Sequence, residues 1–163
     1  MSHPHAQPFP IHAAIITVST TRTTDTDTSG KTIRELLTGK SVPVDHYAII
    51  PDRVEAIRDE LYRALNVANC IIINGGTGLT HDDCTIEAVS PLFEKRIDGF
   101  GEFFRVKSIQ QIGTAAMLSR AAAGIIRGRA VFCIPGSTPA VTLATTELIL
   151  PEITHILSHA NRP

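Results

Sequence analysis

The chain has 163 residues, 43% of them hydrophobic, which is enough apolar material for one folded domain with a full core. Its formal net charge of -1 and isoelectric point near 6.6 argue against a dedicated nucleic-acid binder or membrane-surface binder, since both need a basic field. The apolar runs look too short to span a bilayer, and no signal peptide is expected. The cysteines Cys70, Cys84 and Cys133 are widely spaced and fit reduced thiols, so we expect a cytoplasmic protein.

The beginning of the chain carries no periodic pattern. Residues 1–10 hold three prolines and two histidines, so we expect a flexible tail over residues 1–11 and a single domain over residues 12–163. His3 and His5 could bind a metal, but histidines on a flexible tail are more often solvated.

The first predicted strand covers residues 13–18 and leads into a threonine-rich polar loop over residues 19–30. That loop is long for a connection between a strand and a helix, which is typical of a functional loop. Its end can cap a helix over residues 31–37, where Ser29 and Gly30 offer a hydroxyl and N–H groups. Helix capping alone explains these residue types equally well.

A second strand is predicted over residues 42–50, and Pro51 marks its end. Asp52 is followed three residues later by Glu55, which matches a helix-capping pattern, and apolar residues then recur on one helical face. The sequence alone therefore predicts Asp52 as a helix cap.

A short apolar run over residues 70–73 predicts a strand that is buried on both faces, as in a parallel sheet. The turn after it, Gly75-Gly76-Thr77-Gly78, has few side chains, so its backbone N–H groups can approach a phosphate closely. In open parallel sheets, ligands bind at the carboxyl ends of the strands, which is where this turn lies. A tight turn without a ligand explains the glycines as well.

Three polar residues follow the glycine-rich turn. Thr85 can cap the next helix and Glu87 lies in its first turn, so Asp83 is not needed as a cap. A loop carboxylate beside a bound phosphate would repel it unless a divalent cation lay between them. Asp83 is therefore a candidate ligand of Mg²⁺, the alternative being a carboxylate that caps or is solvated.

The helical pattern weakens over residues 94–108, a stretch that holds three of the six phenylalanines and two glycines. This fits a subunit contact, a pocket wall or a turn in the core. Residues 109–118 are helical in pattern and end at Ser119 and Arg120. Arg120 could clamp a phosphate or simply lie on the surface.

A last buried strand is predicted over residues 130–134, and it runs into Pro135-Gly136-Ser137. This is a second unit of strand, glycine turn and helix. The alternation of buried strands with helices predicts an α/β fold, a three-layer α/β/α sandwich around a mostly parallel sheet.

Two closing helices are predicted over residues 138–148 and 153–159, divided by Pro151. His155 and His159 are one helical turn apart and could form a metal pair. Without a third ligand nearby, we favour packing for both histidines.

These segments resemble the MoaB/MogA family of molybdenum-cofactor biosynthesis proteins over nearly the whole chain after the tail. The MoaB branch in particular is resembled by Asp27-Thr28-Ser29-Gly30, by the Phe104-Arg105 pair and by the Pro135-Gly136-Ser137 turn. The motifs that carry the resemblance are, in chain order, Gly75-Gly76-Thr77-Gly78 with Asp83, Thr85 and Glu87, then Gly99-Phe100-Gly101-Glu102, Ser119-Arg120 and Pro135-Gly136-Ser137.

The resemblance implies a MogA-like molybdopterin-binding fold in a homo-oligomer, either a trimer or a hexamer. It implies molybdenum cofactor biosynthesis in which molybdopterin is adenylylated by MgATP and pyrophosphate is released. It also implies catalysis and Mg²⁺ binding by Asp52 and Asp83. The implied contacts are those of Gly75, Gly76, Thr77, Gly78, Ser119, Pro135, Gly136 and Ser137 with the substrate, and of Ser29 and Gly30 with the nucleotide.

Two positions depart from the family pattern. Ser19-Thr20 stands where MogA-type sequences often have Ser-Asp, and Asp82 stands where a neutral or basic residue is common. Some MoaB proteins lack the aspartate that matches Asp52, so the alternative is a non-catalytic molybdopterin-binding or carrier protein beside a MogA paralogue. The presence of Asp52 favours the enzyme.

Overall fold

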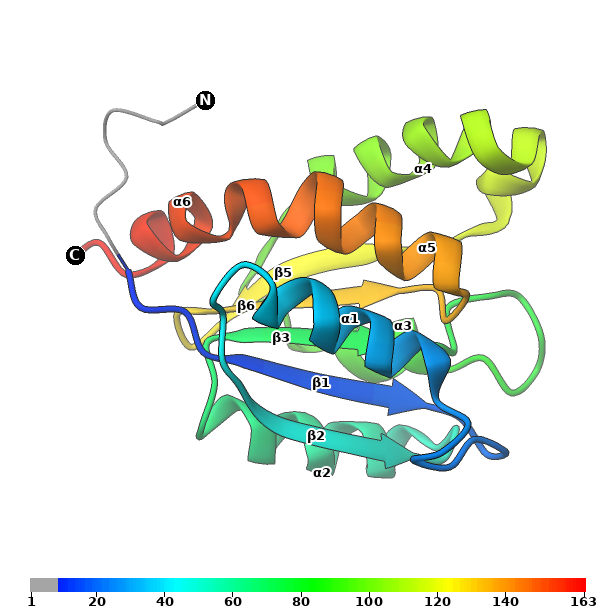
Figure 1. Cartoon of the computed structure of the whole chain (residues 1–163), viewed down its shortest axis with the longest axis horizontal. Coiled ribbons are helices and arrows are strands. Elements are labelled where there is room, and N and C mark those ends of the chain that lie inside the picture. The colour runs from blue at the N-terminus through cyan, green and yellow to red at the C-terminus, as the bar shows by residue number, and fades with distance from the viewer. Residues whose placement is uncertain (1–8) are drawn as a thin grey trace.

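A computed structural model of the chain describes residues 9–163, and a six-stranded sheet lies at its centre (Figure 1). Residues 1–8 of the expected tail, His3 and His5 among them, lie outside the described residues. The strands are β1 (Ala13–Val18), β2 (Val44–Ile50), β3 (Cys70–Asn74), β4 (Lys95–Arg96), β5 (Ala122–Ile126) and β6 (Arg129–Ile134). Across the sheet they follow the order β2-β1-β3-β6-β5-β4.

The sheet is mostly parallel, as the buried apolar runs predicted. Strands β2, β1, β3 and β6 run parallel, whereas β5 and β4 pair antiparallel at one edge. Ile15 on β1 lies opposite Ile72 on β3, which lies opposite Phe132 on β6. β1 and β3 are buried along their whole length, which is expected of strands covered on both faces.

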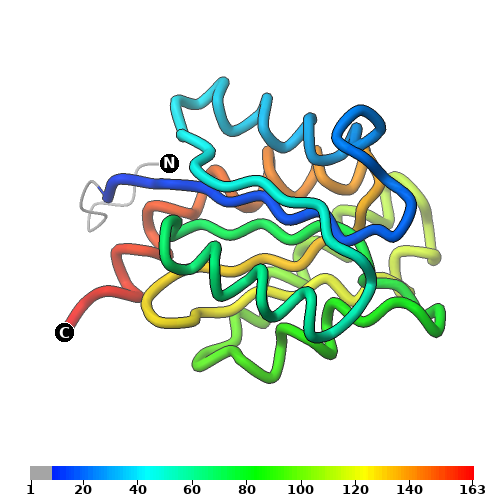
Figure 2. The backbone as a smooth tube through the Cα atoms, turned by 90° about the horizontal axis from the view of Figure 1, so that it is seen from below, coloured from blue at the N-terminus to red at the C-terminus, as the bar shows by residue number. Residues whose placement is uncertain are grey.

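Helices cover both faces of the sheet and produce the three predicted layers (Figure 1). They are α1 (Thr28–Thr38), α2 (Val54–Leu65), α3 (Thr85–Val89), α4 (Asp98–Ile112), α5 (Thr138–Leu143) and α6 (Leu150–Ala160). Helices α1, α4, α5 and α6 share a core with Ile15 and Ile72. Helices α2 and α3 share the other core with Ile16 and Ile73. Figure 2 places the loops after β1 and β3 at the end of the sheet opposite the C-terminus.

The last helical segment is continuous, so the predicted division at Pro151 is wrong. A π-helical stretch, Ala144–Ile149, joins α5 directly to α6. Pro151 lies in the first turn of α6. The π-helical stretch changes the backbone hydrogen bonds just ahead of the proline, and such a change in pattern accommodates a residue that has no N–H to donate.

This continuous segment, Thr138–Ala160, is long and apolar enough to cross a membrane by length and composition alone. This finding corrects the expectation that every apolar run of the chain is too short to span a bilayer. Its Val141, Ile153 and Leu157 side chains, however, are buried in the core against the sheet. A helix that covers a buried parallel sheet needs such an apolar face, and the core of this fold accounts for its hydropathy.

The stretch with the weak pattern is also helical. Helix α4 begins at Asp98, well before residue 109, where we predicted a helix to start. Phe100 and Phe104 are buried in the core, whereas Phe103 is 63% exposed. Apolar side chains on both faces of this helix remove the periodicity on which the prediction relied.

The cysteines are unpaired thiols, as expected. Cys70 and Cys133 are buried, and Cys84 is partly buried. Burial raises the pKa of Cys70 and of Cys133 to about 12, so both remain protonated at neutral pH. Burial, followed by the nearby carboxylate of Asp52, also raises the pKa of Cys84. None of the three has the lowered pKa of a reactive thiolate.

Candidate functional site

The turns after β3 and β6 meet at the carboxyl end of the sheet. The Gly75 N–H donates a hydrogen bond to the Ile134 carbonyl oxygen at 2.9 Å. A Cβ placed on Gly136 would lie 3.2 Å from the Gly75 Cα, so the two backbones are in direct contact. Both glycine turns therefore belong to one site, at the position where open parallel sheets bind ligands.

The backbone explains the glycines of the first turn. Gly75 has a φ of 97° and Gly76 a φ of 70°, in the left-handed region that favours glycine. A Cβ on Gly75 would collide with the Val18 carbonyl oxygen, and one on Gly76 would collide with the Thr85 hydroxyl. Thr85 was predicted as the cap of α3, and this is wrong. Cys84 precedes the helix, and the Thr85 hydroxyl instead donates to the Gly75 carbonyl oxygen at 2.8 Å.

The same turn offers a run of open hydrogen-bond donors. Among residues 9–163, the backbone N–H groups of Gly76, Thr77, Gly78 and Leu79 have no acceptor. The next N–H, that of Thr80, donates to Asp83 Oδ2 at 2.9 Å. Consecutive open N–H groups at the end of a parallel strand are a typical arrangement for binding an anion.

A pocket of about 580 Å³ opens over the two turns. The predicted residues that line it are Gly76, Thr77, Gly78, Asp83, Ser119, Pro135, Gly136 and Ser137. Gly75 lies against Gly136 but is not among the lining residues. The sequence analysis missed the rest of the lining, which is Phe104, Ser108, Gln111 and Ile112 on α4, Leu118 at the end of the 3-10 segment η2 (Gly113–Leu118), and Pro139 and Ala140 on α5. The weak pattern of α4 explains why its four residues were missed.

The two serine hydroxyls in this pocket differ in their hydrogen bonding. Ser137 Oγ accepts a hydrogen bond from the Ala140 N–H at 3.3 Å and caps α5. Ser119 Oγ is buried and, within the described part of the chain, has no hydrogen-bond partner. A buried hydroxyl without a partner costs about 1–3 kcal/mol, and a ligand in the pocket could supply the missing bond.

Asp52 lies beside the first glycine turn and does not cap α2, so that prediction is wrong. A tight turn after β2 moves the helix start by one residue, and Arg53 occupies the cap position without a side-chain bond. Asp52 Oδ1 lies 3.4 Å from the position of a Cβ on Gly76. Burial, followed by the negative charges of Asp83 and Asp82, raises the pKa of Asp52. These three aspartates thus concentrate negative charge beside the pocket.

The carboxylates fit an open magnesium site better than a closed one. Asp83 Oδ2 accepts from the Thr80 hydroxyl at 2.8 Å, and its Oδ1 has no donor among residues 9–163. No group of three Asp, Glu, His or Cys side chains in those residues could hold a metal. Mg²⁺ commonly uses one or two carboxylates and completes its shell with water and substrate phosphates. Asp52 and Asp83 suit that arrangement.

The residues predicted to contact a nucleotide are buried. Ser29 Oγ donates to Asn74 Oδ1 at 3.0 Å, and the Gly30 N–H donates to Asp27 Oδ1 at 3.0 Å. Asp27 is the cap of α1 and is itself fully buried. Burial alone would raise the pKa of Asp27, but hydrogen bonds from Tyr47 and other neighbours bring it below its ordinary value. The end of the polar loop thus caps the helix, as its residue types allowed, through Asp27, and nucleotide contact by Ser29 and Gly30 stays a prediction.

A second cavity of about 590 Å³ lies against the loop after β1. Its lining is Ser19, Thr20, Arg22, Thr23, Thr24, Tyr47, Ala48, Ile49 and Pro51, so it is rich in hydroxyls and carries one guanidinium. Arg22 also donates to the Gly136 carbonyl oxygen at 3.3 Å, which links this cavity to the second glycine turn. The only signal in the sequence was the length of the polar loop.

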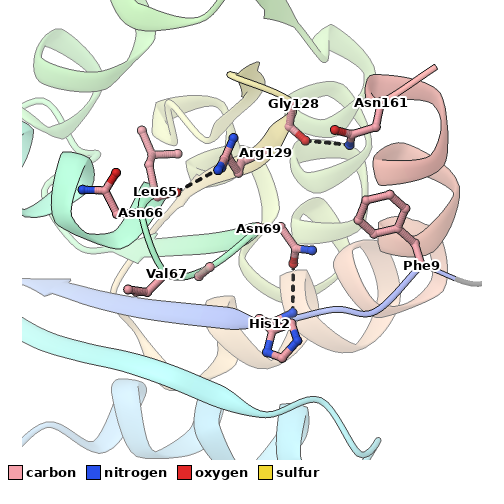
Figure 3. A pocket seen from close by; sticks show the side chains of 10 residues that line it. Phe9, His12, Leu65, Asn66, Val67, Asn69, Gly128, Arg129 and Asn161 are labelled. Carbon is pink, nitrogen blue, oxygen red and sulfur yellow. Dashed lines mark hydrogen bonds between the residues drawn. The ribbon is translucent and has the colours of Figure 1, made fainter. Parts of the chain in front are cut away.

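A further pocket at the other end of the sheet has a different character (Figure 3). The His12 N–H donates to Asn69 Oδ1 at 2.9 Å, and the Asn161 amide donates to the Gly128 carbonyl oxygen at 2.9 Å. Arg129 Nε donates to the carbonyl oxygen of Leu65, the last residue of α2, at 3.0 Å. These polar groups join segments that are distant in the sequence, so they already serve the fold.

The two histidines of α6 lie at the surface, where His155 is half-buried and His159 is exposed. The rings of His155 and His159 meet edge to face, with 4.6 Å between their centroids. His155 Nδ1 lies 3.0 Å from Glu152 Oε2. No cluster of three metal-ligating side chains occurs here or elsewhere in residues 9–163.

Comparison with known proteins identifies the family of this chain. Residues 14–155 match the model of a probable molybdopterin binding domain. The Molybdenum cofactor biosynthesis protein B of Halalkalibacterium halodurans is 47% identical over 158 residues, which cover 95% of this chain and 93% of that protein.

Two crystal structures are also similar. That of a Molybdenum cofactor biosynthesis protein B has a TM-score of 0.91 at 44% identity and covers 96% of this chain and 99% of its own. The crystal structure of the tungsten cofactor synthesizing protein MoaB from Pyrococcus furiosus has a TM-score of 0.86 at 39% identity. The match covers 96% of this chain and 100% of that one. The matched span holds both glycine turns, the wall with Ser119 and the aspartates beside the pocket. The chain therefore belongs to the MoaB branch of the molybdenum cofactor biosynthesis proteins and carries their molybdopterin-binding domain.

Proposed function

We propose that this protein binds molybdopterin in the pocket over the glycine turns and adenylylates it with MgATP, giving adenylyl-molybdopterin and pyrophosphate. The observation that carries the proposal is the pairing of open N–H donors with two neighbouring carboxylates, those of Asp52 and Asp83, whose mutual repulsion contributes to the raised pKa of Asp52 after burial. Donors suit the phosphates of two anionic reactants. The carboxylates suit the magnesium ion that accompanies ATP.

The proposed reaction joins a phosphate oxygen of molybdopterin to the α-phosphorus of ATP. The bond from that phosphorus to the bridging oxygen breaks, and the oxygen leaves with pyrophosphate. Because the attacking phosphate is already an anion, the protein mainly has to align the reactants and neutralise charge. Mg²⁺, when bound, would offset the repulsion between the two anionic reactants and the charge on the leaving group.

In this proposal each group has one task. Asp52 and Asp83 would hold Mg²⁺, and the N–H groups from Gly76 to Gly78 would bind phosphate. Ser119, whose hydroxyl is unpartnered among the described residues, would donate to the pterin or its phosphate. Ser137 would do the same while it caps α5.

The cavity against the loop after β1 is the proposed place for ATP. Its hydroxyls suit ribose and phosphate, and Arg22 adds a positive charge beside the second glycine turn. Ser29 and Gly30 would then contribute by anchoring that loop, since both are buried within the network around Asp27.

The alternative is a non-catalytic molybdopterin-binding or carrier protein. The observation that favours it is the departure at Ser19-Thr20, where MogA-type sequences often have Ser-Asp, so one carboxylate is missing from this chain. The pocket and the fold would be the same in both cases, so turnover distinguishes them.

We also propose that the protein assembles as a homotrimer or homohexamer. Most of the large exposed apolar side chains in residues 9–163 lie on α4 and η2. Ile112 and Leu118 belong to this surface and to the pocket wall, so a second copy packed there would complete the wall. A monomeric mass in analytical ultracentrifugation would contradict the assembly.

The decisive experiment measures adenylyl-molybdopterin and pyrophosphate formed by the purified protein from molybdopterin and MgATP. Asp52→Ala and Asp83→Ala should each lower turnover by about 100-fold or more while molybdopterin still binds. Asp59→Ala, an exposed aspartate on α2, is the control and should be unchanged. An Asp82→Ala, Asp83→Ala double variant tests rescue by the neighbouring carboxylate. Molybdopterin binding without turnover by the wild type would refute the enzyme and leave the carrier.

A further inference from the structure

Arg120 lies behind the first glycine turn and is held on several sides. Its Nε donates to the carbonyl oxygens of Thr77 at 3.3 Å and Gly78 at 3.0 Å. Both terminal nitrogens donate to the carboxylate of Glu87, one of them at 3.0 Å. Arg120 does not line the pocket, whereas its neighbour Ser119 does. The guanidinium thus binds the backbone of the turn and the carboxylate of Glu87, so Arg120 is not a free surface arginine.

The contacts of Arg120 fix the direction of two N–H groups. In a trans peptide unit the carbonyl and the N–H point in opposite directions, and the described chain has no cis peptide bond. The Thr77 carbonyl shares its peptide unit with the Gly78 N–H, and the Gly78 carbonyl shares its unit with the Leu79 N–H. By holding both carbonyls, Arg120 therefore directs both N–H groups away from itself. Neither N–H has an acceptor among residues 9–163.

We propose that Arg120, held by Glu87, is a positioning residue that directs the N–H groups of Gly78 and Leu79 at the phosphate of the ligand and does not bind the ligand itself. This inference rests on the proposed molybdopterin site and explains how its donors are ordered before the ligand arrives. Donors that are already oriented need no reorganisation when the anion binds.

The ion pair is suited to this task. The hydrogen bond from Arg120 lowers the pKa of Glu87, so both groups are charged at neutral pH. The guanidinium is a rigid fork, and it can hold a carboxylate and backbone carbonyls at the same time. A lysine would keep the positive charge but lacks that fork.

Substitution of Glu87 separates positioning from direct ligand binding. If Arg120 bound the phosphate itself, Glu87→Gln would free the guanidinium from a competing carboxylate, and affinity for molybdopterin would rise. If Arg120 positions the turn, the same substitution loosens it, and affinity falls. The two roles therefore predict opposite signs.

The experiment titrates molybdopterin into the full-length protein. Glu87→Gln and Arg120→Lys are each expected to weaken binding by about 10-fold, the effect of one lost oriented hydrogen bond. The control is Glu147→Gln, which breaks a surface pair with Lys107 and should leave binding unchanged. In ¹⁵N-labelled wild type, molybdopterin should shift the amide resonances of Gly78 and Leu79, and the shifts should shrink in Glu87→Gln.

The outcomes are distinct. Tighter binding by Glu87→Gln would overturn positioning in favour of a direct clamp. Equal binding by the wild type, Glu87→Gln and Arg120→Lys would overturn the inference while leaving the site intact. A wild-type protein that binds no molybdopterin would overturn the proposed function and this inference with it.

Discussion

Replacement of Ser119 by alanine should stabilise the free protein and weaken its binding of molybdopterin. Ser119 Oγ is buried in the pocket wall without a partner among residues 9–163. Such a hydroxyl costs about 1–3 kcal/mol, so we expect the free energy of unfolding of Ser119→Ala to rise by about 1 kcal/mol. The same change removes a donor to the ligand, and a loss of about 1.4 kcal/mol lowers the affinity by about 10-fold.

Thr145 provides the matched control. Its hydroxyl is also buried and unpartnered among the described residues, but it lies in the π-helical stretch and does not line the pocket. Thr145→Val should raise the free energy of unfolding by a similar amount and leave molybdopterin binding unchanged. The pair of variants thus separates the cost of a buried hydroxyl from its use by a ligand.

Urea denaturation of the free proteins and titration with molybdopterin measure the two quantities. A lower free energy of unfolding for Ser119→Ala would show that the hydroxyl has a partner after all. A more stable Ser119→Ala that binds molybdopterin as the wild type does would refute the role of Ser119 in the site.

Two further predictions concern stability. Gly75→Ala should lower the free energy of unfolding by about 2–4 kcal/mol, since φ is 97° and the Cβ would meet the Val18 carbonyl oxygen. Gly99→Ala in α4, where a Cβ would meet nothing within 4 Å, should be neutral or gain up to about 1 kcal/mol, so equal urea midpoints for the two would contradict the argument. Asp27→Asn should cost about 2 kcal/mol at pH 7. Although burial raises the pKa of Asp27, hydrogen bonds from Tyr47 and other groups hold it below its ordinary value. The contribution of the ionised form is therefore complete above about pH 4 and is lost as pH falls through the lowered pKa, and a pH-independent difference would count against it.

The central strands could be predicted from the sequence because each is buried on both faces. The runs at residues 13–18, 70–73 and 130–134 are almost wholly apolar, which is the pattern expected of strands covered on both faces. Helix α4 could not be predicted in the same way, because Phe103 and other apolar side chains lie on its exposed face. An exposed apolar surface destroys the periodicity that identifies a helix.

The site was predictable where its chemistry is local and not where it depends on distant contacts. The glycines of the two turns stand out because the backbone there excludes side chains. The role of Asp52 as a helix cap was wrong, because the turn before α2 moves the helix start and frees the carboxylate. Arg120 reaches the Gly78 carbonyl across 42 positions of sequence, and no spacing rule indicates such a contact.

The polar groups around the pocket also restrict the kind of ligand that can satisfy them. The open N–H groups of the first glycine turn need an acceptor, whereas Asp52 and Asp83 need positive charge. A phosphate alone would satisfy the N–H groups but would be repelled by the carboxylates, and a cation alone would satisfy only the carboxylates. A phosphate ligand that arrives together with a divalent cation satisfies both sets at once. This requirement follows from the arrangement of donors and charges, and the magnesium ion and anionic reactants of the proposed function would meet it.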